Sequence, residues 1–139
     1  MKNRRNFIKT SLAATVAVAA SKTVFSQNVS KSSSEINLPG VIYTKKTPGK
    51  WKLKVDSHLP QIKINGPEIT LTTDHGMSEA HYIVRHTLVD KNGLVIGSKT
   101  FYPDDKPVST YTLPENYKGK LFATSFCNKH DFWVNEFEV

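Results

Sequence analysis

Apolar and polar residues alternate along most of the chain after Gly40, in short segments rich in Val, Ile, Thr and aromatic residues. This pattern predicts β-strands that each turn one face toward a core. We expect strands over residues 51–55, 61–64, 68–73, 81–89, 94–101, 108–113, 121–126 and 132–139. Asp90-Lys91-Asn92-Gly93 has the composition of a hairpin turn. The chain is therefore predicted to be all-β, an immunoglobulin-like antiparallel β-sandwich of about seven strands, with a small β-barrel as the alternative.

The first 27 residues have a different character. A basic start is followed by an uncharged run, Thr10 to Ala20, which is too short to span a bilayer, and Ala17-Val18-Ala19 is an acceptable cleavage motif. The pair Arg4-Arg5 resembles the twin-arginine export signal. We expect residues 1–27 to be this signal, 28–40 to be a flexible linker and 41–139 to be the folded domain. The alternatives are an uncleaved membrane anchor and a disordered basic tail.

Charge and cysteine content restrict the function further. Five of the 19 Lys and Arg residues precede Ser26, whereas all 12 acidic residues follow it. The basic balance therefore belongs mostly to the signal and gives no support for nucleic-acid binding. We expect a periplasmic protein without stable membrane association, and a homo-oligomer is left open. Cys127 is the only cysteine, so an intramolecular disulfide is impossible, and a buried, intermolecular or metal-bound thiol is expected instead.

Four of the five histidines and Cys127 fall into three clusters where predicted strands meet loops. These clusters are Asp56-Ser57-His58-Leu59-Pro60, His75-Gly76-Met77-Ser78-Glu79-Ala80-His81 and Cys127-Asn128-Lys129-His130. Residues six apart in an extended strand lie roughly 20 Å apart, so His75 and His81 can share a metal only if the chain folds back between them. Gly76 would permit unusual backbone angles there, and Ser78-Glu79-Ala80 would form a single helical turn. His86 has no partner at a useful spacing and is left out of the predicted site.

The residue types select among metals. Imidazoles with one thiolate suit zinc, copper or iron. Structural zinc takes four ligands, one fewer than the five candidates. A blue-copper centre uses two His and one Cys with a weak axial ligand that is often Met, and no Met follows His130. Four imidazoles in a plane with an axial thiolate would leave the opposite position open, which suits a redox iron that binds a small oxygen species.

The three clusters resemble those of the superoxide reductases, the family of neelaredoxin and of the iron domain of desulfoferrodoxin. That family typically has Glu-Lys-His-Val-Pro, His-Pro-Met-x-x-x-His-Tyr-Ile and Cys-Asn-x-His-Gly-x-Trp. The likeness extends over about residues 51–139. It implies one non-haem iron (Fe²⁺/Fe³⁺) per chain, and it implies a ligand set with four equatorial histidines and one axial thiolate: His58, His75, His81, His130 and Cys127.

The resemblance implies a reaction and two partners. Superoxide would be the substrate, reduced by one electron to hydrogen peroxide, and an external donor protein would then return the electron. Asp56 and Ser57 replace the Glu and Lys of the family motif, so we expect slower capture of superoxide or a positive field supplied by Lys129. Arg85 replaces a Trp. The competing functions are an iron or copper electron carrier or redox sensor, and a β-sandwich carrier or adhesion module whose histidines are incidental.

Overall fold

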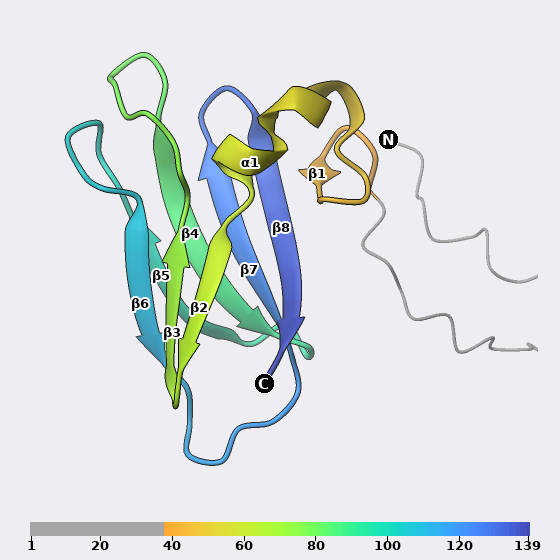
Figure 1. Ribbon diagram of the computed structural model, residues 1–139, viewed down its shortest axis with the longest axis vertical. Helices are drawn as coiled ribbons and strands as arrows, with labels where there is room; N and C mark the ends of the chain where they lie inside the picture. The colour runs from red at the N-terminus through yellow and green to blue at the C-terminus, as the bar shows by residue number, and fades with distance from the viewer. Residues whose placement is uncertain (1–37) are drawn as a thin grey trace, which may run out of the picture. The chain divides into compact units, whose positions relative to one another are not determined.

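The computed structural model describes residues 38–139, and these residues form a two-layered β-sandwich (Figure 1). One sheet has five strands in the order β1-β8-β7-β4-β5, and the other has three in the order β2-β3-β6. The strands are β1 (Ile42–Tyr43), β2 (Gln61–Asn65), β3 (Glu68–Thr72), β4 (Ile83–Asp90), β5 (Val95–Thr100), β6 (Val108–Thr112), β7 (Lys120–Cys127) and β8 (Asp131–Glu138). The predicted all-β fold is confirmed.

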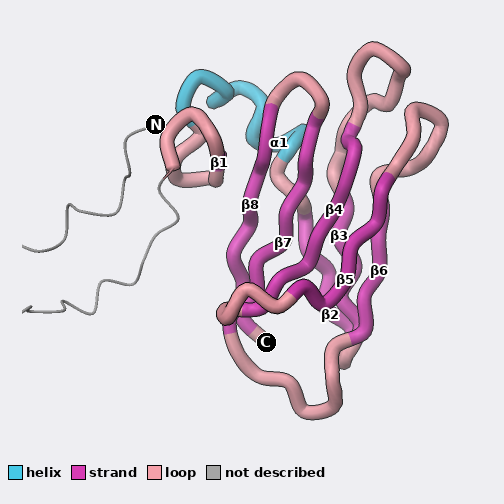
Figure 2. The backbone as a smooth tube through the Cα atoms, turned by 180° about the vertical axis from the view of Figure 1, so that it is seen from behind, coloured by secondary structure: helices cyan, strands magenta, loops and turns pink. Residues whose placement is uncertain are grey.

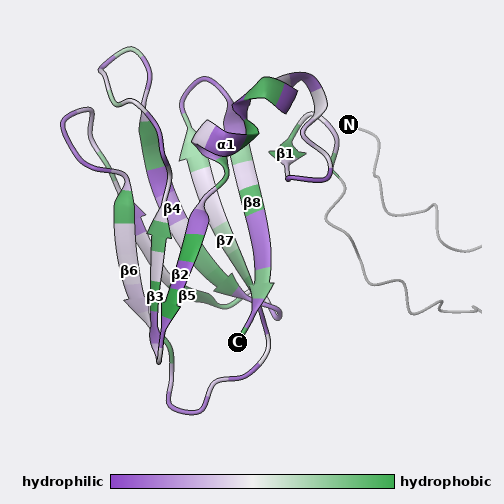
Figure 3. Ribbon diagram, viewed as in Figure 1, coloured by the Kyte–Doolittle hydropathy of each residue, from purple (hydrophilic) through white to green (hydrophobic). Residues whose placement is uncertain are grey.

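The alternation in the sequence places the core between the two sheets. Every second residue of β7 is buried, beginning with Leu121 and ending with Cys127. The main core cluster combines residues of both sheets: Ile69, Leu71, Leu88, Leu113, Leu121 and Ala123. Figure 3 shows apolar and polar bands alternating along the strands. Because apolar side chains of β3 pack on those of β4 and β7, the hydrophobic effect holds the sheets together.

Two features differ from the sequence-based expectation. The segment predicted as a strand over 51–55 is helical, forming the 3₁₀ helix η1 (Gly49–Lys54) and the single α-helical turn α1 (Val55–His58). The strand β1 was not predicted, and it pairs with β8 in parallel, whereas all other strand pairs are antiparallel. The predicted turn after Asp90 is confirmed, because the Asp90 carboxylate accepts hydrogen bonds from the backbone N–H groups of Asn92 and Leu94.

The sandwich brings several connections to one end. Figures 1 and 2 show α1, the β3–β4 connection and the β7–β8 turn at the end opposite the C-terminus. The predicted signal (1–27) and most of the predicted linker lie outside the described residues. Within residues 38–139, no helix is long and apolar enough to cross a membrane.

Candidate metal centre

The five residues predicted as ligands meet at this end of the sandwich. His58 ends α1, His75 and His81 lie in the β3–β4 connection, and Cys127 and His130 flank the β7–β8 turn. Their potential ligand atoms all lie within 4.8 Å of one another. His86, which was not predicted as a ligand, is not part of this group.

The imidazole nitrogens face one another in close succession. His58 Nε2 lies 2.8 Å from His130 Nδ1, His130 Nδ1 lies 3.0 Å from His81 Nε2, and His81 Nε2 lies 3.1 Å from His75 Nε2. The rings of His58 and His75 are perpendicular, with centroids 4.6 Å apart. Two nitrogens at right angles about one transition-metal ion lie about 3.0 Å apart, because each metal–nitrogen bond is about 2.1 Å long. The spacing of the four imidazoles therefore fits a shared metal ion.

The thiol completes the group from the core side. Cys127 Sγ lies 3.6 Å from His130 Nδ1, and the side chain packs with Ile83, Phe101 and Met77. Burial raises the pKa of the Cys127 thiol above its usual value. The thiol is therefore protonated at neutral pH unless a cation lies beside it, and a bound metal ion would deprotonate it. The group therefore offers one sulfur and four imidazole donors, the set that suits a thiolate–imidazole metal site. The sulfur and two of the imidazoles are buried, and the other two imidazoles are partly exposed.

Electrostatics also favour a cation between neutral imidazoles. Burial first, and then the neighbouring His75 and His130, lower the pKa of His58 from 6.5 to about 3. Burial is also the largest cause of the lowered pKa of His75, His81 and His130. All four rings are therefore neutral at pH 7, which is the form that binds a metal.

Hydrogen bonds to the preceding turn orient His58. Its Nδ1 lies 2.8 Å from Ser57 Oγ and 3.1 Å from the carbonyl oxygen of Lys54. The Ser57 hydroxyl itself donates to the Lys54 carbonyl. These acceptors keep the proton on Nδ1, so the lone pair of Nε2 points into the cluster. From the sequence, Ser57 was expected only to lack the positive charge of a Lys, and this contact was not predicted.

The β3–β4 connection folds back without a helical turn. Ser78 and His81 form an isolated antiparallel bridge in which each backbone N–H donates to the other carbonyl, at 3.0 Å. The expected helical turn over Ser78-Glu79-Ala80 is therefore wrong. Gly76 does not adopt the left-handed backbone conformation that its missing side chain would permit. The reversal instead depends on the bridge and on the N–H of His75, which donates to the Thr73 carbonyl.

The β7–β8 turn holds Cys127 and His130 in a tight geometry. Asp131, which directly follows, has a φ of 63°, a conformation that favours Gly. The Trp133 indole N–H donates to the His130 carbonyl at 2.9 Å. The Trp51 ring lies edge-on to the His130 ring, with centroids 4.5 Å apart. The turn is thus fixed by aromatic residues from both η1 and β8.

Asn128 ties two of the ligand-bearing segments together. Its Oδ1 accepts a hydrogen bond from the Tyr82 N–H at 3.0 Å, and its Nδ2 donates to the Ala80 carbonyl at 3.3 Å. Its backbone N–H also donates to the Tyr82 carbonyl at 3.2 Å. These bonds bracket His81 and join it to the turn of Cys127 and His130. The motif that contains Asn128 did not predict this role.

Two lysines place positive charge around the cluster. The charges of Lys129 and Lys54 both contribute, after burial, to the lowered pKa of His81, and both also act on His130. Lys129 is exposed in the β7–β8 turn, whereas Lys54 is half-buried at the end of η1. Lys54 was not predicted as part of this field, because the segment was interpreted as a strand.

Two other polar features lie outside the metal centre. His86 is fully buried, and its ring nitrogens lie 2.8 Å from Thr73 Oγ1 and 3.0 Å from Ser109 Oγ.

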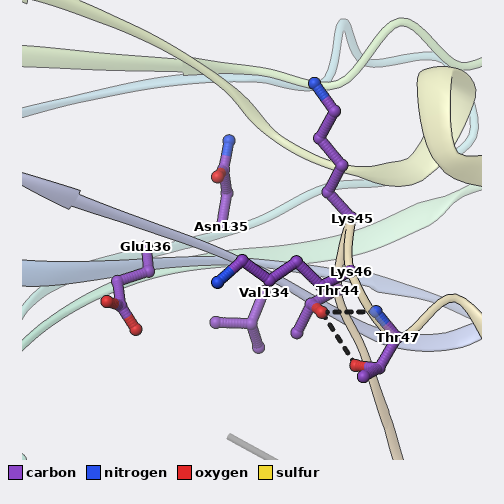
Figure 4. Close-up of a pocket in the computed structure, with 7 residues that line it drawn as sticks. All are labelled: Thr44, Lys45, Lys46, Thr47, Val134, Asn135 and Glu136. Atoms are coloured by element: carbon purple, nitrogen blue, oxygen red, sulfur yellow. Dashed lines mark hydrogen bonds between the residues drawn. The ribbon is translucent and has the colours of Figure 1, made fainter. Parts of the chain in front are cut away.

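A pocket of about 350 Å³ lies between the segment after β1 and the strand β8 (Figure 4). It is lined by Thr44, Lys45, Lys46, Thr47, Val134, Asn135 and Glu136, and none of the five clustered residues lines it.

Comparisons with known proteins agree with this architecture. The family model described as Desulfoferrodoxin matches residues 50–136. The superoxide reductase (neelaredoxin) from Ignicoccus hospitalis has a similar structure, with a TM-score of 0.60 and 26% identity, over 70% of this chain and 93% of that chain. The superoxide reductase (1Fe-SOR) from Giardia intestinalis gives a TM-score of 0.55 and 27% identity, over 60% of this chain and 99% of that chain. No curated protein sequence matches the chain. Because the family model covers more than half of the sequence, including all five clustered residues, the chain belongs to the desulfoferrodoxin family.

Proposed function

We propose that this protein is a superoxide reductase that holds one iron ion with His58, His75, His81, His130 and Cys127. One observation carries the proposal: four imidazole nitrogens and one thiol sulfur converge within 4.8 Å in a chain whose structural relatives include superoxide reductases. The substrate would be superoxide and the product hydrogen peroxide. Bound iron would supply the electron, as an Fe²⁺/Fe³⁺ couple with a thiolate ligand.

The chain would contribute a site that is protected on one side and accessible on the other. Cys127 and His58 are each 1% exposed, so the core shields the sulfur from water. His75 and His81 are partly exposed, and a small anion would therefore approach from their side. The low dielectric around the thiol strengthens its interaction with a cation. The bonds from Ser57 and Lys54 would keep His58 in the orientation that a metal needs.

Positive charge would attract the substrate. Lys54 and Lys129 act on His81 and His130, although Ser57 stands where the family motif has a Lys. A positive field at a partly buried site raises the local concentration of an anion and its rate of association. We therefore assign the field to Lys54 together with Lys129, rather than to Lys129 alone.

We further propose that the protein acts in the periplasm after export by the twin-arginine route. The support is the sequence alone: paired arginines, a short uncharged run and an acceptable cleavage motif. That route carries folded proteins, which suits a metal centre loaded before export. A donor protein in the same compartment would return the electron after each turnover.

A second candidate function is electron transfer or redox sensing without superoxide reduction. The replacement of the motif Lys by Ser57, whose hydroxyl is occupied with His58 and Lys54, favours it. Such a protein would hold a metal in the same five ligands and cycle between oxidation states. Its metal would be indifferent to superoxide, and this property separates the two candidates.

The test begins with anaerobic purification and metal analysis. We expect about one iron per chain, and we expect Cys127→Ser to lose the visible thiolate-to-iron absorption of the oxidised protein. A pulse of superoxide onto the reduced protein should then oxidise it. Zinc or copper in the site, or an unchanged metal content in Cys127→Ala, would contradict the proposed iron site. A reduced iron protein that does not react with superoxide would support the electron carrier instead.

A further inference from the structure

The 3₁₀ helix η1 presents an exposed leucine between lysines. Leu53 is 96% exposed, the largest value among the large apolar side chains identified as exposed in residues 38–139. Its neighbours Lys50 and Lys52 are exposed and Lys54 is half-buried. The side chain of Leu53 therefore contributes nothing to the core of the sandwich and is accessible to another molecule.

The helix η1 also contacts the metal centre. Trp51, which belongs to the same helix, has its ring 4.5 Å from the ring of His130, and the Nζ of Lys50 lies 4.7 Å above the Trp51 ring. The helix continues into α1, which ends at His58. In Figure 3 the coil that precedes α1 carries apolar and polar bands side by side. The indole ring of Trp51 therefore lies against both an exposed lysine of η1 and a ligand imidazole.

The charge of the surface is positive. Three lysines and one acidic residue, Asp56, lie between Gly49 and His58, and Lys129 approaches the same histidines from the β7–β8 turn. A basic rim around one exposed apolar side chain complements an acidic partner with an apolar contact point. The apolar part is a single leucine, which suits the small, short-lived interfaces of electron-transfer complexes better than a permanent one.

We propose that η1, with Lys50, Lys52 and Leu53 at its surface, is the docking site of an acidic protein that donates single electrons to the metal centre. The inference rests on the proposed function, because superoxide reduction removes one electron from the site at each turnover. In the transfer, the donor is oxidised by one electron and the site is reduced by one electron, and no bond is made or broken. Trp51 provides the contact between the docked donor and His130.

The test compares two matched double variants of the iron-loaded protein. Lys52→Glu with Leu53→Ser changes the proposed surface. Lys91→Glu with Leu94→Ser makes the same changes in the β4–β5 hairpin, where Leu94 is 67% exposed. Each oxidised protein is mixed with reduced plant-type ferredoxin, an acidic one-electron donor protein, and separately with ascorbate, which has no protein surface. The reaction of each reduced protein with superoxide is measured in parallel.

We expect the η1 variant to accept electrons from ferredoxin at least tenfold more slowly than the wild type, and the hairpin variant to differ by less than twofold. The wild-type rate should fall with added salt, whereas the rate with ascorbate should be the same in all three proteins. Equal ferredoxin rates in both variants would overturn the docking site, even if superoxide reduction is intact. Sedimentation showing a wild-type dimer that the η1 variant loses would also overturn it, in favour of self-association. A wild type that accepts electrons from ferredoxin but ignores superoxide would refute the proposed function and leave the docking site standing.

Discussion

Asn128 offers the sharpest test of how the metal centre is held together. Its side chain makes two hydrogen bonds to the β3–β4 connection, one to the Tyr82 N–H and one to the Ala80 carbonyl. Asn128→Ala removes both and leaves the backbone bond from residue 128 to Tyr82 in place. The variant should therefore fold, with His81 less firmly joined to the turn of Cys127 and His130.

The magnitude follows from the exposure of these groups. Each net hydrogen bond contributes about 1 kcal/mol, and because Asn128 is exposed, water can replace part of that value. The loss should be about 1–2 kcal/mol. If the lost energy mainly affects the metal-bound form of the protein, metal affinity falls about 5- to 30-fold. This range overlaps the roughly 10- to 100-fold loss that is typical when a partner of a metal ligand is removed.

Competition with a chromogenic chelator under anaerobic conditions measures the affinity for Fe²⁺. Urea unfolding of the metal-free protein measures the stability separately. Asn128→Asp keeps the acceptor for Tyr82 and loses the donor to Ala80, so it should lie between the wild type and Asn128→Ala. Asn92→Ala, in the β4–β5 hairpin, is the control and should leave the affinity unchanged. An Asn128→Ala protein with wild-type affinity would refute the claim that this side chain holds the ligand segments together.

Three further predictions concern charge, backbone and pH. Lys129→Ala and Lys54→Ala should each lower the second-order rate constant for the reaction with superoxide about two- to fivefold and weaken its salt dependence. Pulse radiolysis measures both effects. An unchanged rate constant would show that the replaced lysine does not attract the substrate. Asp131→Gly should raise the free energy of unfolding in urea by up to about 1 kcal/mol, because the φ of 63° is costly for a residue with a Cβ. Asp131→Asn removes the charge but keeps the Cβ, so it separates the two effects. Burial first, and then the charge of Lys99, lower the pKa of His86 from 6.5 to about 4. This lowered pKa contributes stability above pH 6.5 that is lost as the pH falls to about 4, on the order of 3 kcal/mol. His86→Gln should flatten this slope in the metal-free protein, and an equally steep slope would contradict the assignment.

The sequence was most informative where alternation and burial coincide. In β7, Leu121 and Ala123 are fully buried at alternate positions, and this period of two predicts both the strand and the face that turns inward. The same logic failed at 51–55. Trp51, Val55 and His58 also lie at helical spacing, and a period-two interpretation over five residues does not distinguish the two. In a strand, Leu53 would face the same side as Trp51 and Val55, which are partly buried. Leu53 is instead exposed, which fits the helix, and this exposure is seen only in the folded chain.

The five clustered residues of the candidate site could be predicted from the sequence, but the contacts that orient them could not. The five clustered side chains stand in recognisable motifs, and the structure places them together. The contacts of Ser57 with His58 and of Asn128 with Ala80 depend on how the turns close in space, which motif spacing does not encode. The field of Lys54 was missed for a related reason, because its position depends on η1 being helical rather than extended.

The product yield of the reaction with superoxide tests the central claim most directly. One-electron reduction consumes one superoxide, one electron and two protons for each hydrogen peroxide formed, and it releases no oxygen. Dismutation instead consumes two superoxide molecules for each hydrogen peroxide and releases one oxygen. We predict that the anaerobic, reduced iron protein gives one hydrogen peroxide per superoxide consumed, with one iron oxidised and no oxygen evolved. A yield of one half with oxygen evolution, or no acceleration over the spontaneous reaction, would contradict the account.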